Sequence, residues 1–178
     1  DHNSQFGDKN TGSISYGYRL NPNWRANIGY GTAFKAPSFN DLYYPLTFGS
    51  YGNPNLLPES SRNREAAVHY EAGLHHVSLT WFRNDVKNLI SWVETPPGSF
   101  AYTPSNIGNA RLEGTTLAYE GQIGSFNLQA NFNHLDPRDT DTGRRLARRA
   151  NNYGSAAIGQ RLAAWEWRTE VIGSGDRF

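Results

Sequence analysis

The stretch WRANIGYGTAF, residues 24–34, alternates between two kinds of side chain. Every second residue from Trp24 to Phe34 belongs to a largely apolar set, and the residues between them are Arg, Asn, Gly, Gly and Ala. A period of two predicts a β-strand with one greasy face and one small or polar face. A soluble sandwich would cover the greasy face with a protein core, whereas a membrane barrel would cover it with lipid.

The same alternation recurs along the chain and predicts an all-β fold of about eight strands. A single helical turn is expected near 85–89, and the fourth strand is expected to resume through 89–94. The predicted strands are 11–20, 24–34, 63–73, 76–84, 109–123, 126–135, 150–162 and 165–173.

The predicted connections alternate between short and long. The short ones are 21–23, 73–75, 124–125 and 163–164, and the long ones are 35–62, 95–108 and 136–149. Successive connections in an antiparallel meander fall at opposite ends of the sheet. Short turns at one end and long loops at the other are typical of outer-membrane β-barrels.

The residues opposite the apolar sets also favour a barrel. Glu166, Arg168 and Glu170 share one face of the last strand, where a dry core would impose a large desolvation cost but a wetted lumen would not. Aromatic residues are expected in girdles at the strand ends. They are Trp24, Tyr30, Phe34, Trp81, Phe126, Trp165 and Trp167.

An antiparallel sheet with one solvated face, in a soluble β-rich binding domain, stays open as the alternative. Exposure separates the two folds. A core that buries the apolar faces would contradict the barrel, and an exposed belt would support it. The side chains that decide are Trp24, Ile28, Tyr30, Phe126, Leu128 and Phe132.

Composition narrows the function classes. Hydrophobic residues make up 37% of the chain, and mean hydropathy is −0.69. No run of apolar residues approaches the length of a membrane-spanning helix. The net charge of +1 gives no field that would favour nucleic acid. Cysteine is absent, which excludes disulfides, thiol nucleophiles and cysteine metal sites. Methionine is absent as well, and we expect an internal fragment of a longer protein.

Four motifs in order resemble the TonB-dependent outer-membrane receptors. They are YGTAFKAPSFNDLYYP at 30–45, YGNPNLLPESS at 51–61, WFRNDVKNLI at 81–90 and NIGNARLEGTTLAYEG at 106–121. Within that family, DHNSQFG at 1–7 and LARRAN at 146–151 are most similar to cobalamin (vitamin B-12) receptors.

The resemblance implies an antiparallel transmembrane β-barrel of 22 strands that encloses an N-terminal plug. Residues 1–178 would then be a partial barrel domain without the plug, in the outer membrane of a Gram-negative bacterium. The implied activity is active import of cobalamin, with energy from TonB acting through the plug. No enzyme activity and no cofactor is implied. A siderophore receptor is the alternative within the family.

One ligand-binding residue follows from the resemblance. Arg148 occupies the position in LARRAN at which the family's arginine contacts the bound corrinoid, and a guanidinium suits amide carbonyls or a phosphate. Arg149 is expected to face the other way. The loop arginines are alternatively expected to contact lipopolysaccharide phosphates, and lipid and lipopolysaccharide are the expected membrane partners.

Other candidate sites are weaker. No catalytic constellation and no metal site is expected. His75 and His76 should point to opposite faces of a strand, and Asp136, Asp139 and Asp141 lack the glutamate of a calcium loop. Tyrosines in the first long loop are expected chiefly to lie at the membrane interface or to pack against loop residues, with ligand stacking as the alternative. These are Tyr43, Tyr44 and Tyr51.

Overall fold

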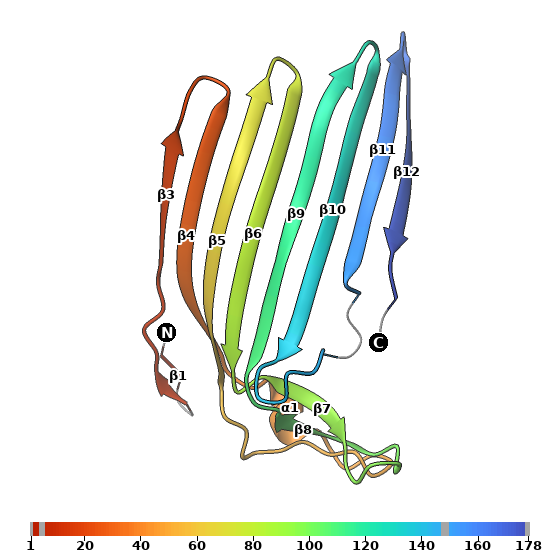
Figure 1. Cartoon of the computed structure of the whole chain (residues 1–178). Helices are drawn as coiled ribbons and strands as arrows, with labels where there is room; N and C mark the ends of the chain where they lie inside the picture. The colour runs from red at the N-terminus through yellow and green to blue at the C-terminus, as the bar shows by residue number, and fades with distance from the viewer. Residues whose placement is uncertain (1, 4–5, 147–149, 177–178) are drawn as a thin grey trace.

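The computed structural model describes residues 2–3, 6–146 and 150–176, and its main feature is one sheet of eight antiparallel strands (Figure 1). Each strand pairs with the strands that flank it in the sheet order β12-β11-β10-β9-β6-β5-β4-β3. The strands are β3 (Ser13–Arg19), β4 (Trp24–Lys35), β5 (Glu59–Ala72), β6 (His75–Lys87), β9 (Ala110–Ile123), β10 (Phe126–Asp139), β11 (Asn152–Leu162) and β12 (Trp165–Ser174). All eight predicted strands are confirmed.

Shorter elements lie outside this sheet. They are β1 (His2–Asn3) paired with β2 (Gly7–Asp8), the helix α1 (Phe39–Tyr43), and β7 (Ile90–Glu94) paired with β8 (Tyr102–Asn106). The helical turn predicted near 85–89 is wrong, because 85–87 belong to β6. The strand predicted to resume at 89–94 is present as β7, but it does not continue in the main sheet. Asn88 has a φ of 56°, which breaks the strand, and β7 pairs with β8 outside the main sheet.

The short turns all lie at one end of the sheet and the long connections at the other, as predicted (Figure 1). At the first short turn, the Asn21 side chain accepts hydrogen bonds from the backbone N–H groups of Asn23 (2.9 Å) and Trp24 (3.0 Å). Gly73 and Gly124 adopt φ of 59° and 61° at the next two turns. We call the elements at the opposite end, α1, β7, β8 and their connecting segments, the loop layer.

Strand register sorts the side chains onto two faces. Val68, Leu79, Leu117 and Phe132 are direct neighbours across β5, β6, β9 and β10. We call their side the belt face and the opposite side the polar face. The belt face is uncovered, since Ile28 is 60% exposed and Leu79 and Phe132 are each 52% exposed. The exposed belt predicted for a barrel wall is confirmed.

Buried apolar side chains are few among the described residues, and those in the sheet are small or medium in size: Ala67, Val86, Ala110 and Ala157. The most buried apolar side chains of the loop layer are Leu42 and Leu56, at 5% and 2% exposure, and Ala101 in the second long loop is buried as well. Figure 1 shows a single curved layer of strands with no second layer packed on it. Within the described ranges, no helix is long and apolar enough to cross a membrane.

The side chains on the belt face change from mainly uncharged to mainly charged toward the loop layer. Trp81 lies in the last mainly uncharged row and donates from its indole N–H to Glu113 (3.1 Å). Beyond it the strands continue with two rows of mostly charged residues. They are Arg64, Arg83, Glu113 and Asp136, then Arg62, Asp85, Arg111 and Arg138. Trp81 was predicted at a strand end but lies within β6, because the strand continues past the apolar belt.

Charge placed on the two faces should have unequal effects. We expect Leu79→Arg, in the intact protein that contains this chain, to lower the free energy of unfolding by about 2–4 kcal/mol, because the guanidinium would face lipid hydrocarbon. Ser78→Arg is the matched control, since Ser78 precedes Leu79 in β6 and lies on the polar face. Urea-induced unfolding in phospholipid vesicles measures both. Equal losses in the two variants would contradict a lipid-facing belt.

Candidate functional site

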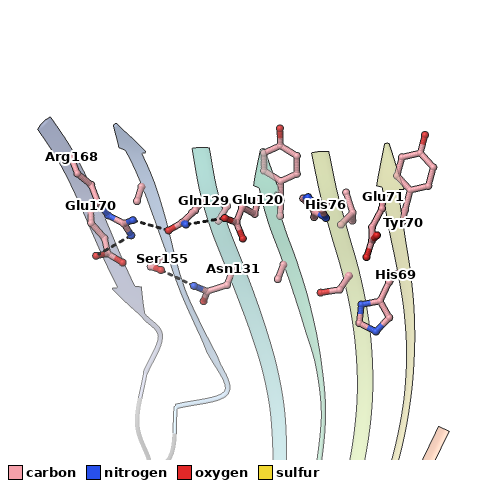
Figure 2. Close-up of a pocket in the computed structure, with 16 residues that line it drawn as sticks. His69, Tyr70, Glu71, His76, Glu120, Gln129, Asn131, Ser155, Arg168 and Glu170 are labelled. Carbon is pink, nitrogen blue, oxygen red and sulfur yellow. Dashed lines mark hydrogen bonds and ion pairs between the residues drawn. The ribbon is translucent and has the colours of Figure 1, made fainter. Parts of the chain in front are cut away.

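A hollow of about 330 Å³ lies on the polar face over β5, β6 and β9 to β12 (Figure 2). Its polar lining residues include His69, His76, Glu120, Gln129, Asn131, Ser155, Arg168 and Glu170. Their strands are held at hydrogen-bonding distance by the ladder, so these groups form a fixed two-dimensional array.

One chain of polar contacts crosses the sheet from β9 to β12. The Gln129 amide donates to Glu120 (3.5 Å) and accepts from Arg168 (2.8 Å), and Arg168 also lies 3.9 Å from the Glu170 carboxylate (Figure 2). Gln129 reaches Arg168 across β11, where the register places the small side chain of Ala157 between the two strands. The predicted polar face of the last strand is therefore confirmed.

A second chain uses neutral groups. Thr116 donates to Asn133 (2.8 Å), Asn133 donates to Asn131 (3.1 Å), and Asn131 donates to Ser155 (2.7 Å). Amides and hydroxyls carry donors and acceptors beyond those used in these bonds. The array can therefore bind water or a polar protein surface in many geometries.

The two adjacent histidines separate, as predicted. His75 Nδ1 lies 2.9 Å from the Tyr119 hydroxyl, and His76 lines the hollow of the polar face. His69 Nε2 lies 2.7 Å from the Asn27 amide oxygen. Among residues 2–3, 6–146 and 150–176, no group of three or more His, Cys, Asp or Glu is placed to hold a metal ion.

The loop layer begins with a capped helix. The Ser38 hydroxyl accepts from the Asp41 backbone N–H (3.2 Å), and the Asp41 carboxylate accepts from the Ser38 backbone N–H (2.9 Å), which completes a capping box for α1. The second Asp41 oxygen accepts from the Trp92 indole N–H (3.1 Å) and so links α1 to β7. Tyr44 packs edge-on against Trp92 with ring centroids 5.4 Å apart.

Asparagines join the first and second loops. The Asn106 side chain accepts from the Leu57 backbone N–H and donates to the carbonyls of Leu57 and Asn88, each at 2.8 Å. Asn53 donates to the Pro104 carbonyl (3.1 Å). Both asparagines belong to the motifs quoted above, so these motifs hold the loop layer together.

The loop layer presents an apolar tip that the sequence patterns did not reveal. Phe48 is 98% exposed and Phe100 is 82% exposed, and both adopt positive φ. The Tyr102 backbone N–H donates to the Ser50 hydroxyl (2.9 Å), which brings the two turns together. Exposed apolar groups held in a fixed arrangement are typical of a surface that contacts a ligand or a protein.

The third long connection, 136–149, contains the aspartates and arginines considered above as candidate site residues. Asp136 binds Arg138 (2.7 Å), and Asp141 accepts from the Asn109 backbone (2.9 Å), so these carboxylates serve separate protein partners. The backbone N–H groups of Thr142 and Asp141 lower the pKa of Asp139. Arg148 and Arg149 lie outside the described residues.

The predicted packing role of the loop tyrosines is confirmed for two of them. Tyr44 contacts Trp92, and Tyr43 packs against Phe39 with ring centroids 5.1 Å apart. Tyr51 is 46% exposed, and its backbone N–H donates to the Tyr102 carbonyl (3.2 Å).

Comparison with known proteins gives consistent matches. The family model described as "TonB dependent receptor-like, beta-barrel" matches residues 1–178. The vitamin B12 transporter BtuB of Vibrio vulnificus is 37% identical over 150 residues, which cover 84% of this chain and 24% of that protein. The vitamin B12 transporter BtuB of Photobacterium profundum is 28% identical over 185 residues, covering 100% of this chain and 29% of that protein.

Solved structures share the fold. A ferric enterobactin receptor mutant from Pseudomonas aeruginosa, in complex with enterobactin, matches 99% of this chain and 29% of its own with a TM-score of 0.80 and 21% identity. The copper transporter OprC matches 90% of this chain and 25% of its own with a TM-score of 0.74 and 18% identity. The chain thus spans 24% to 29% of the length of the curated relatives described above.

Protonation of Asp41 should loosen the loop layer. Burial alone would raise its pKa, but hydrogen bonds from Ser38 and Trp92 and the charge of Lys35 bring the pKa below its ordinary value of 3.8. Since the folded pKa is the lower one, the stabilisation is complete above pH 3.8 and is lost as pH falls through the folded pKa. Hydrogen exchange of residues 38–45, corrected for intrinsic rates, should show lower protection at pH 2.5 than at pH 6.

Two variants test the assignment to Asp41. Asp41→Asn should show reduced protection already at pH 6 and a smaller further change on acidification. Asp141→Asn, in the third loop, should leave the behaviour of residues 38–45 unchanged. Full protection of 38–45 in Asp41→Asn at both pH values would show that this carboxylate does not hold the first loop.

Proposed function

Because the chain belongs to the TonB-dependent receptor β-barrel family, we propose that it forms part of the barrel wall of an outer-membrane receptor that imports cobalamin. The similarity to two proteins named as vitamin B12 transporters carries the choice of ligand. The chain covers less than a third of those proteins. In our proposal, the plug, further wall strands and the site that engages TonB belong to the rest of the receptor.

The two faces and two ends of the sheet support an orientation. The belt face would contact the hydrocarbon of the outer membrane of a Gram-negative bacterium, and the polar face would face the lumen and the plug. The short turns would lie in the periplasm and the loop layer outside the cell, which is the arrangement of bacterial outer-membrane barrels.

The proposed mechanism is transport without covalent chemistry. The Glu120–Gln129–Arg168 chain and its neighbours offer the plug many interchangeable hydrogen-bond partners. Such contacts can be exchanged for water at small net cost, since a protein hydrogen bond contributes about 0.5–1.5 kcal/mol net. A plug pulled by TonB could therefore move along this wall without breaking a tightly packed apolar interface.

In this proposal, the loop layer forms part of the extracellular vestibule in which the ligand first binds. Phe48 and Phe100 offer apolar contact area to a large ligand, and their turns are held together by backbone and side-chain hydrogen bonds. Arg148 would bind an amide carbonyl or phosphate of the corrinoid with its planar donor fork. A ferric siderophore is the other ligand to test, because siderophore receptors share this fold.

Loss of Arg148 should weaken ligand binding in the intact receptor. We expect Arg148→Ala to raise the Kd for cyanocobalamin at least tenfold, because one charge-assisted hydrogen bond is worth about 1.5–3 kcal/mol. Equilibrium binding of labelled cobalamin to the purified receptor measures this change, and Arg144→Ala in the same loop is the control. Unchanged affinity in Arg148→Ala would overturn the role of this residue. Binding of a ferric siderophore without binding of cobalamin would overturn the ligand.

A further inference from the structure

A buried carboxylate lies where the loop layer meets the wall. Glu59, the first residue of β5, is 9% exposed and is the only buried charged residue in the part of the chain that the structure describes. Its Oε1 atom accepts from the Lys35 ammonium (3.3 Å) and from the Ile90 backbone N–H (3.0 Å). Lys35 ends β4 and pairs with Glu59 across the ladder, whereas Ile90 begins β7. One oxygen therefore joins the end of the wall to the start of β7.

The segment before Glu59 also binds the base of β7 and β8. We call these two strands and the connection between them the β7–β8 hairpin. Besides the bonds between Asn106 and Leu57 described above, the Asn88 amide donates to the Pro58 carbonyl (3.4 Å). Those bonds join neutral groups, and charge-assisted bonds such as those of Glu59 are roughly twice as strong. Glu59 is also the member of this group that belongs to the wall, so it ties the hairpin to the paired sheet.

The β7–β8 hairpin is hydrogen-bonded internally from its base to its tip. Pairing begins with Ile90 opposite Asn106 and ends with Glu94 opposite Tyr102. Beyond the last pair, the Glu94 carboxylate accepts from the Phe100 backbone N–H (2.6 Å). Five paired residues span about 17 Å. A change of angle at Ile90 would therefore reach Phe100 as a displacement of the tip.

The two charged groups at this junction have unequal environments. The Lys35 side chain is 64% exposed and the Glu59 side chain is 12% exposed. An exposed ammonium is solvated when it loses its partner, whereas a buried carboxylate without a partner is left uncompensated. The Ile90 N–H needs an acceptor, which a carboxylate or a neutral amide can supply. Substitution can therefore separate the geometric role of Glu59 from its ionic role.

We propose that Glu59 is a positioning residue for ligand binding, because its carboxylate sets the angle at which the β7–β8 hairpin leaves the wall. That angle places Phe100, and Phe48 follows because the two turns are hydrogen-bonded to each other. The proposal rests on the vestibule proposed above and goes beyond it by naming the group that holds the apolar tip in place. Glu59 itself would not touch the ligand, since its side chain is buried.

Equilibrium binding of labelled cyanocobalamin to the purified intact receptor tests this role. Glu59→Ala removes the acceptor and should raise the Kd at least about fivefold, since the hairpin loses a charge-assisted bond to the wall. Glu59→Gln combined with Lys35→Met keeps an acceptor for Ile90 and leaves no unpaired charge, so its Kd should stay within about twofold of the parent value. Ser60→Ala is the control, because Ser60 pairs with Phe34 and so lies on the belt face.

Hydrogen exchange at the Ile90 amide, corrected for intrinsic rates, reports on the junction without any ligand. Protection should fall in Glu59→Ala and return in the double variant Glu59→Gln with Lys35→Met. A double-mutant cycle then asks whether Glu59 acts through the tip. In a receptor that carries Phe48→Ala and Phe100→Ala, the further change Glu59→Ala should alter the Kd by less than about twofold, because the positioned side chains are gone.

Several outcomes would overturn the proposal. They are parental affinity in Glu59→Ala, no rescue in the double variant, a loss in Ser60→Ala equal to that in Glu59→Ala, or an equal effect of Glu59→Ala with and without the two tip phenylalanines. Failure of the parent receptor to bind cobalamin would refute the proposed ligand instead. Hydrogen exchange at Ile90 would then decide whether Glu59 fixes the hairpin, since that measurement needs no ligand.

Discussion

The constraint on which this structure depends is continuous backbone pairing across the eight strands. A sheet in contact with hydrocarbon must satisfy its backbone N–H and C=O groups internally, because lipid offers no partners. The ladder that meets this requirement also directs successive side chains to opposite faces. A belt row such as Val68, Leu79 and Leu117, and an opposite array around Gln129, both follow from the same register.

The sheet was predictable from the sequence because its signal is local. Alternation within each strand located all eight strands, although several continue beyond the predicted ends. The loop layer was not predicted, since its contacts join residues far apart in sequence. Trp92 and Asp41 are 51 residues apart, and Asn106 and Leu57 are 49 apart. One local signal was present, because Ser38 and Asp41 have the spacing of a capping box.

The sequence predicted that the candidate site would be a polar face of the sheet, but it did not predict which side chains would be hydrogen-bonded there. The charged face of β12 pointed to a wetted surface, yet the bond from Gln129 to Arg168 depends on the small Ala157 between them. The motifs that resemble the receptor family contain Asn53 and Asn106, which join loop backbones. These motifs therefore supply contacts that hold the loop layer together, whereas Phe48 lies between two of them and is exposed.

The two charged rows beyond Trp81 have a mechanical consequence. Four further residues per strand extend the paired wall by about 13 Å along the strand, and Asp85 holds three arginines from β5, β6 and β9 together across this extension. In the proposed orientation, this extension of the wall would project beyond the hydrocarbon and carry the loop layer. The loop layer would then keep its arrangement when the surrounding bilayer thins or thickens, because the strands that support it are hydrogen-bonded to one another beyond the membrane.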